Sequence, residues 1–405
     1  MLATHNGVAV QEGLMERLFD ARRRSDALFD LVRVEALYER PIPERHRIIF
    51  YVGHLEAFDW NLFHQRVFGV RSSQPEFDRL FAFGIDPVGG GLPVDQPSDW
   101  PALNAVRDYV AKTRSRIDEQ LWEAVAESAS RVHDGTPLSV LLNVAIEHRL
   151  MHVETLMYML HQLPFEQKVR TSEVPEPEAS PASEGMIEVP AASVVLGLAR
   201  NSELFGWDNE FEAHAEDVAE FAIDRHKVTN RQYAEFLAAG GYEMRSLWSD
   251  EDWNWITSQV ISRPVFWNRD GDRWLYRTMF EEVPLPLDSP VYVSHAEATA
   301  YARWAGKSLP TEAEWQHAAS STNSCGIHGL FGNGWEWTST VFAPFPGFEP
   351  FSFYRGYSAD FFDGKHFVMK GGSPVTAACM LRPTFRNWFQ AHYQYVYAGF
   401  RCLSR

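Results

Sequence analysis

The fold of the first half of the chain is decided by the stretch Glu147-His148-Arg149-Leu150-Met151-His152-Val153-Glu154. It lies inside a run, 138–163, that contains neither Gly nor Pro, so the sequence predicts one continuous helix there. Residues four positions apart share a helix face, so His148 and His152 point in the same direction. That face is otherwise apolar, with Leu141, Ala145, Leu156 and Met159. Both imidazoles are therefore expected to face the protein interior.

Two neutral imidazoles one helical turn apart form half of a transition-metal site. Spacing alone leaves a second interpretation open, in which both are core histidines that hydrogen-bond to the backbone or to each other. His54 is a candidate third ligand, because it lies in a second predicted helix, about 45–68, between Phe50 and Phe58. The residues alone do not select the metal, because three imidazoles suit Zn, Fe, Cu or Ni.

Length and charge restrict the class of protein. A chain of 405 residues is expected to form two or three domains. The net charge of −17 argues against a nucleic-acid or anionic-membrane partner, since both require a cationic surface. The sequence has no run of 18 apolar residues and no signal-peptide pattern, which predicts a protein of a bacterial-type cytoplasm.

The remaining periodic segments of the first half predict a four-helix bundle. Helical spacing of apolar residues extends over 13–40 and again over about 101–131. The segment 74–100 carries four prolines and Gly89-Gly90-Gly91, and is expected to be a loop. The glycine run lacks the flanking strand and the spacing of a dinucleotide site. Bundle cores commonly build metal sites from facing side chains.

The composition changes sharply after the bundle. We expect domains at 1–165 and 186–405, joined by a linker at 166–185 that is rich in Pro, Ser, Thr and Glu. The second domain is predicted to be α+β, with short strands near 189–198 and 221–223 and helices at 230–239, 295–305 and 311–319. Thr311 and Glu314 form a predicted capping box for the last of these. Three scattered cysteines give no disulfide framework.

The second half contains several specific motifs. They are Ile223-Asp224-Arg225-His226-Lys227-Val228-Thr229-Asn230-Arg231-Gln232-Tyr233, Ser308-Leu309-Pro310-Thr311-Glu312-Ala313-Glu314-Trp315, Gly332-Asn333-Gly334-Trp335-Glu336-Trp337 and Ala398-Gly399-Phe400-Arg401. This half resembles the sulfatase-modifying-factor, or formylglycine-generating, family, which implies a C-type-lectin-like domain. The first half, with Gly53-His54 and His148-x-x-x-His152-x-Glu154, resembles a DinB-like bundle. In this order the two halves resemble the non-haem iron sulfoxide synthases of ergothioneine and ovothiol biosynthesis.

The resemblance implies a ligand set and excludes one relative. It implies that His54, His148 and His152 bind Fe(II), and that Glu154 supports these ligands without binding the iron itself. Formylglycine-generating enzymes carry a close cysteine pair late in the domain, whereas Cys379 and Cys402 are far apart here. A sulfatase-maturation oxidase is therefore not expected.

The resemblance also implies an acceptor substrate, hercynine, which is Nα-trimethylhistidine. A quaternary ammonium is held by aromatic faces and an amide oxygen. Asn387 and Trp388 occupy the positions of the family's Arg-Asn-Trp motif, and Tyr357 is expected to form another wall of the pocket. Taken alone, Trp388 is more typical of core packing in so aromatic a domain.

A catalytic tyrosine is the next implied element. Mycobacterial-type sulfoxide synthases use a tyrosine that gives a proton or an electron during the reaction with O₂ and steers it away from thiol dioxygenation. The segment Tyr354-Arg355-Gly356-Tyr357 resembles that region, which makes Tyr354 our candidate. A phenol suits the task because it can donate a proton near neutral pH.

The sulfur-donor positions depart from the family pattern. Members that use γ-glutamylcysteine have an Asp after Arg-Asn-Trp and an Arg four positions later. Here those positions are Phe389 and Tyr393, which cannot form that pair of ionic contacts. The expected donor is therefore cysteine, or a selenosugar as in the related selenoneine synthases.

Two hypotheses from other classes compete with this one. The first is a non-catalytic lectin-like binding protein whose bundle histidines are structural. The second is a zinc-dependent thiol transferase of the DinB type, which would need no oxygen.

Overall fold

The computed structural model describes the chain except for residues 1, 85–91, 128–134, 171–177, 180–184 and 321–325. It divides into two compact units, Met1–Glu173 and Val174–Arg405. The predicted loop Gly89–Gly91 and Cys325 lie outside the described residues, as does most of the predicted linker 166–185. None of the described helices combines the length and the apolar character that a membrane span needs.

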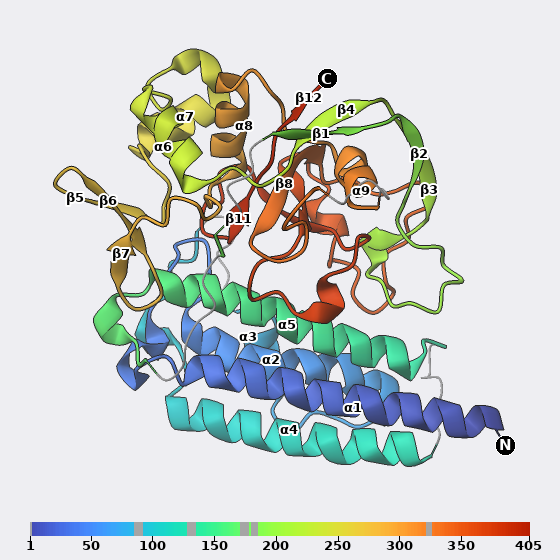
Figure 1. Cartoon of the computed structure of the whole chain (residues 1–405). Helices are drawn as coiled ribbons and strands as arrows, with labels where there is room; N and C mark the ends of the chain where they lie inside the picture. The colour runs from blue at the N-terminus through green and yellow to red at the C-terminus, as the bar shows by residue number, and fades with distance from the viewer. Residues whose placement is uncertain (1, 85–91, 128–134, 171–177, 180–184, 321–325) are drawn as a thin grey trace. The chain divides into compact units, whose positions relative to one another are not determined.

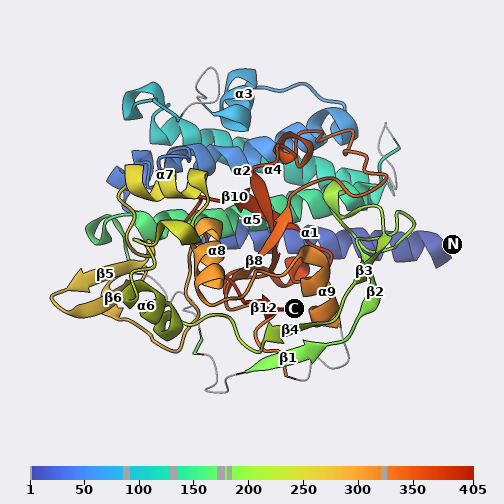
Figure 2. The ribbon, with the colours of Figure 1, turned by 90° about the horizontal axis from the view of Figure 1, so that it is seen from above.

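The first unit is helical. Its helices are α1 (Leu2–Phe29), α2 (Ile48–Phe63), α3 (Pro75–Phe83), α4 (Leu103–Ala126) and α5 (Leu138–Gln162). The four long helices α1, α2, α4 and α5 lie side by side in both views (Figure 1, Figure 2). Helix α5 is buried along most of its length, as expected for a helix with apolar residues on every side. The predicted bundle is confirmed, and α5 matches the predicted segment 138–163 to within one residue.

The first helix differs from its prediction at both ends. It begins at Leu2 and ends at Phe29, whereas apolar spacing predicted 13–40. The reason for the early end is a backbone pairing outside the helix. The Arg33 N–H donates to the Gln167 carbonyl at 2.9 Å, and the Val169 N–H donates to the Leu31 carbonyl at 2.8 Å. These bonds draw the chain after Phe29 into an extended bridge, and residues 34–38 then form a 3₁₀ turn.

Helix α3 corrects the prediction that 74–100 is a loop. Pro75 stands at its first turn, where the missing N–H costs nothing, and Glu76 and Asp78 favour the positive helix end. Phe81 is fully buried against α2. A Cβ at Gly53 would lie 2.5 Å from the Phe81 ring, so only glycine permits this close approach.

The second unit is α+β. Its strands form the sheets β1–β4–β12, β10–β9–β8–β11, β2–β3 and β5–β6–β7. Their bounds are β1 Met186–Val189, β2 Ala192–Leu196, β3 His214–Val218, β4 Phe221–Asp224, β5 Trp267–Asp270, β6 Arg273–Arg277, β7 Glu282–Pro284, β8 Trp335–Val341, β9 His366–Gly371, β10 Asn387–Gln390, β11 Ala398–Gly399 and β12 Leu403–Ser404. The helices are α6 (Asn230–Ala238), α7 (Asp250–Ser258), α8 (His295–Trp304) and α9 (Glu312–Ser320). Helices α8 and α9 lie on either side of β8 (Figure 1, Figure 2).

All four sequence motifs meet at one buried carboxylate, that of Glu336. Glu336 accepts hydrogen bonds from Arg401 at 2.6 and 2.8 Å and from the Trp315 indole at 3.0 Å. Lys227, from the first motif, forms an ion pair with it at 3.1 Å. A buried carboxylate with this many donors fixes the relative positions of β8, α9 and the end of the chain. The predicted capping box is also confirmed, because Thr311 and Glu314 bond reciprocally.

Candidate metal centre

His54 is positioned by contacts on both sides of its ring. The ring stacks on Phe50 with centroids 4.7 Å apart, one helical turn earlier on α2. Its Nδ1 lies 2.7 Å from the Phe81 carbonyl oxygen of α3 and donates a hydrogen bond to it. That bond places the proton on Nδ1 and leaves the Nε2 lone pair available to bind a cation. Helix α3, which the sequence did not predict, therefore sets the tautomer of this histidine.

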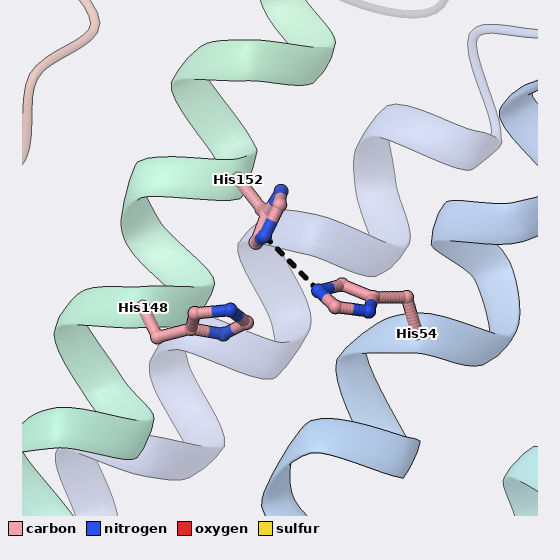
Figure 3. Close-up of side chains that lie close together, drawn as sticks. All are labelled: His54, His148 and His152. Atoms are coloured by element: carbon pink, nitrogen blue, oxygen red, sulfur yellow. Dashed lines mark hydrogen bonds between the residues drawn. The ribbon is translucent and has the colours of Figure 1, made fainter. Parts of the chain in front are cut away.

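His148 and His152 face His54 from α5 (Figure 3). The ring centroid of His54 lies 5.3 Å from that of His148 and 4.7 Å from that of His152. His148 also stacks on Phe58 at 3.4 Å. The three side chains each offer one nitrogen, and these nitrogens lie within 4.8 Å of one another. The three histidines predicted from the sequence therefore lie together in one cluster.

Burial keeps the three imidazoles neutral. Desolvation lowers the pKa of His54 to about 4, and it lowers the pKa values of His148 and His152 well below the usual range. Repulsion from a neighbouring histidine lowers each pKa further, from His152 at His148, from His54 at His152 and from His46 at His54. Metal binding requires the unprotonated ring, so the cluster is ready for a cation at neutral pH.

The nitrogen spacing fits a transition-metal ion. The Nε2 atoms of His54 and His152 are 3.1 Å apart. Two imidazole nitrogens bound at about 2.1 Å and at right angles would lie about 3.0 Å apart. The described part of the chain contains no other group of three such ligands within this range. The geometry is compatible with a metal site, and the same 3.1 Å separation is also a hydrogen-bond distance between the two rings (Figure 3).

A second cluster, in the second unit, is aromatic. Trp388 stacks on Phe342 with centroids 4.2 Å apart and an interplanar angle of 6°. Tyr357 meets the Trp388 ring edge-on at 5.3 Å, and Phe361 lies 5.6 Å from it. Trp388 remains half-buried, so it is not a residue of the closed core. The Asn387 side-chain oxygen accepts a hydrogen bond from the backbone N–H of Trp388 at 2.9 Å, which uses one of its two lone pairs.

Tyr354 lies next to this aromatic cluster. Its ring is 5.5 Å from that of Tyr357, and burial raises its pKa to about 12. The Asp208 carboxylate accepts a hydrogen bond from the Ser358 hydroxyl at 2.6 Å. Ser358 follows the tyrosine by four positions, so Asp208 holds the C-terminal end of its loop.

The two donor-site candidates stack on each other. The rings of Phe389 and Tyr393 are 4.9 Å apart with an interplanar angle of 13°. Both side chains are half-buried. Together they present aromatic surface at the two positions where family members that use γ-glutamylcysteine carry Asp and Arg.

Comparison with known proteins agrees with both halves of this description. Residues 17–156 match the DinB superfamily, and residues 171–323 and 320–405 match the sulfatase-modifying factor enzyme 1-like domain. A hercynine oxygenase of Mycolicibacterium thermoresistibile is 30% identical over 447 aligned residues, covering 98% of this chain and 96% of its own length. The chain belongs to the hercynine oxygenase family. The members of that family are oxidoreductases.

Two further relatives support the same placement. The hercynine oxygenase of Mycolicibacterium smegmatis is 31% identical over 81% of this chain and 83% of its own. The formylglycine-generating enzyme of Mycobacterium tuberculosis is 25% identical and matches 54% of this chain. The similarity to the two hercynine oxygenases therefore extends over both halves of the chain. The predicted family and domain order are confirmed.

Some residues that shape the two clusters carry little or no signal in the sequence. Gly53 and Phe81 bring α3 to His54, and Asp208 holds the tyrosine loop. The amphipathic order Phe77, Leu80, Phe81 after an N-terminal proline was the available signal for α3. The local sequence does not indicate the role of Asp208, because its hydrogen-bond partner Ser358 lies far along the chain.

Replacing His148 by Ala is expected to abolish iron binding and turnover. Mutation of a residue that hydrogen-bonds to a metal ligand typically lowers metal affinity by about 10–100-fold. Loss of a ligand itself should weaken Fe(II) binding by more than that. His161→Ala is the matched control, because His161 is also buried on α5 but lies outside the triad. Iron content after anaerobic loading measures the effect. Unchanged iron content in His148→Ala would contradict the ligand assignment.

Asp208 is expected to make stability depend on pH. Burial raises its pKa from 3.8 to about 6, so the folded protein binds this proton more tightly than the unfolded chain. The resulting stabilisation is complete below pH ~4 and is lost as pH rises through about 6, by at most ~3 kcal/mol.

The measurement is urea unfolding of the wild-type protein and Asp208→Asn from pH 4 to 7. The free energy of unfolding of the wild-type protein should fall relative to the variant as pH rises. The exposed Asp217→Asn controls for the loss of one negative charge. Parallel curves for wild type and Asp208→Asn would refute a raised pKa at this carboxyl.

Proposed function

We propose that this protein is an Fe(II)- and O₂-dependent oxygenase that joins a thiol to the imidazole carbon of hercynine. The observation that carries the proposal is the buried triad of His54, His148 and His152 in a chain related over 98% of its length to a hercynine oxygenase. The donor we favour is cysteine rather than γ-glutamylcysteine. The product class would be a sulfoxide on the route to ergothioneine.

The reaction balances with O₂ as the only oxidant. The imidazole C–H and the donor S–H bonds break, and a C–S bond and an S–O bond form. One oxygen atom enters the sulfoxide, and the other leaves as water with the two hydrogens. Fe(II), when bound, would supply the one-electron chemistry that O₂ requires.

The three histidines suit this task by their number and charge. Three neutral ligands leave up to three positions of an octahedral ion for substrates and O₂. Their burial excludes water from the protein side of the ion, and the Phe81 carbonyl keeps the His54 ring in a single tautomer. Zinc would fit the same nitrogens, but relatedness to oxygenases favours a redox-active metal.

The aromatic cluster suits the trimethylammonium group of hercynine. Such a cation has no N–H to donate, and it is attracted to the faces of Trp and Tyr. Trp388 is half-buried, and the Tyr357 ring lies at nearly right angles to it with centroids 5.3 Å apart. Tyr357 is buried and stacks on Trp207 at 4.0 Å, so the Trp388 face is the surface that we propose for the cation. The second lone pair of the Asn387 oxygen completes the contact that we propose.

Tyr354 is our candidate for the proton donor. The phenol remains protonated at neutral pH, because its pKa is raised to about 12. The phenol therefore still carries the proton, or hydrogen atom, that we propose it gives in the reaction. Asp208, through Ser358, holds one end of the loop that carries Tyr354.

A selenosugar is the second candidate for the donor. The stacked pair Phe389 and Tyr393 favours it, because sugar rings pack their C–H faces on flat aromatic surfaces. In that case a C–Se bond forms at the same imidazole carbon. The proposed chemistry of the acceptor is the same for both donors.

One competition experiment tests the function. The iron-loaded protein receives hercynine with cysteine, γ-glutamylcysteine and a selenosugar in air, and mass spectrometry identifies the products while an electrode follows O₂. We expect O₂ consumption only with hercynine and a donor together, and little product from γ-glutamylcysteine. Thiol transfer without O₂ uptake would instead support a zinc transferase, and no product with any donor would support a binding protein.

Tyr354→Phe is expected to change the product ratio. Loss of the phenolic proton should lower the yield of C–S product relative to oxidised donor thiol, on the order of 10²-fold. Tyr276→Phe, at a buried tyrosine of β6, is the control for removing a hydroxyl. Product ratios are read by mass spectrometry. An unaltered ratio in Tyr354→Phe would assign the proton transfer to another group.

A further inference from the structure

A cluster of buried charged side chains connects the helices of the bundle. Its four most buried members, each at most 3% exposed, are Arg22 of α1, Glu56 and Asp59 of α2, and Arg149 of α5. Removing charges from water is costly, and apolar residues of similar volume often hold helices together at least as well. General stability is therefore a poor reason for this cluster. A specific geometric role is the better-attested use of buried ionic groups.

Arg149 makes the contacts that connect the two metal-binding helices. Its Nη2 donates hydrogen bonds to the Asp59 carboxylate at 2.7 Å and to the Leu55 carbonyl oxygen at 2.9 Å. The same nitrogen lies 3.1 Å from the Glu56 carboxylate. Arg149 directly follows His148, and Leu55 directly follows His54. One guanidinium therefore joins the neighbours of two members of the triad.

The bond to Leu55 differs in kind from the ionic contacts. A carbonyl inside a helix spends one lone pair on the residue four positions later, and the second lone pair remains available to Arg149. Because the acceptor belongs to the main chain, the bond fixes the position of α2 along its axis relative to α5. A slip of one residue moves a helix by about 1.5 Å. Metal–ligand distances tolerate only about 0.2 Å, so such a slip would separate the triad.

We propose that Arg149 is a positioning residue that sets the register between α2 and α5, and hence the nitrogen spacing of His54 against His148 and His152. The inference rests on the proposed function only in requiring that the triad binds a metal ion. It makes no use of the substrates. Arg149 acts on the triad through the two helices that carry its members.

Arg22 provides a matched control within the same cluster. It is also buried, and it lies 3.9 Å from Glu56 and 3.7 Å from Asp59. It pairs with Asp118 of α4 as well. These contacts are with carboxylates of α2 and α4, so Arg22 shares the charge environment of Arg149 without linking α2 to α5.

The experiment compares Arg149→Lys with Arg22→Lys in the full-length protein. Each variant keeps the positive charge but loses the planar guanidinium. Anaerobic titration with Co(II) alone, followed by ligand-field absorption, gives the metal affinity and the coordination geometry. Urea unfolding of the metal-free proteins gives the change in stability.

We expect Arg149→Lys to weaken Co(II) binding by about tenfold or more and to alter the ligand-field bands. Arg22→Lys should retain the wild-type bands and an affinity within about twofold of wild type, even if it loses as much stability. Should Arg149→Lys not fold, Asp59→Asn replaces it, because this change removes the charged anchor of the guanidinium, and weaker binding with altered bands is again expected.

Two results would overturn the inference. The first is wild-type Co(II) affinity and bands in a folded Arg149→Lys or Asp59→Asn protein. The second is an equal loss of affinity in the Arg149 and Arg22 variants, which would show a general effect of stability. Failure of the wild-type protein to bind Co(II) would instead refute the metal site itself, whereas normal Co(II) binding without turnover of hercynine by the iron-loaded protein would refute only the proposed reaction.

Discussion

The metal site that we propose in the first unit depends on three unprotonated imidazoles in an apolar interior. A single buried histidine is common, but three rings with nitrogens within 4.8 Å of one another disfavour protonation and crowd their lone pairs together. A cation bound to all three nitrogens would occupy the crowded lone pairs, and it requires the unprotonated rings that burial favours. The aromatic rings of Phe50 and Phe58, stacked on His54 and His148, hold the nitrogens toward one another.

Buried charge serves the second unit in a different way. Glu336 accepts hydrogen bonds from Arg401 and the Trp315 indole and forms an ion pair with Lys227. These three partners come from three separate sequence motifs. Nearby, Arg386 donates to Glu312 at 3.0 Å just before β10, the strand that carries Trp388. These contacts hold the aromatic cluster on a rigid base. A domain with so few long strands obtains its order from such ionic centres and from aromatic packing.

Features of the fold that arise from local periodicity were predictable from the sequence, whereas features that depend on distant contacts were not. The run 138–163 gave α5 almost to the residue, because no other signal opposed the helical spacing. The end of α1 at Phe29 was missed because the pairing of Leu31 with Val169 is invisible in local sequence. Helix α3 was missed because prolines outweighed its short amphipathic pattern, although Pro75 is a helix-starting residue. The grouping of the three histidines was predictable in outline, but their approach to within 4.8 Å required the packing of α2 on α5.

We propose that His54, His148 and His152 bind one iron ion together. X-ray absorption at the iron edge of the Fe(II)-loaded protein, without substrates, tests it most directly. We expect three imidazoles, with nitrogen at about 2.1 Å and the outer-ring scattering that imidazole produces, and the remaining positions filled by oxygen ligands. A fit that requires sulfur bound to the iron, or that contains fewer than three imidazoles, would contradict the claim.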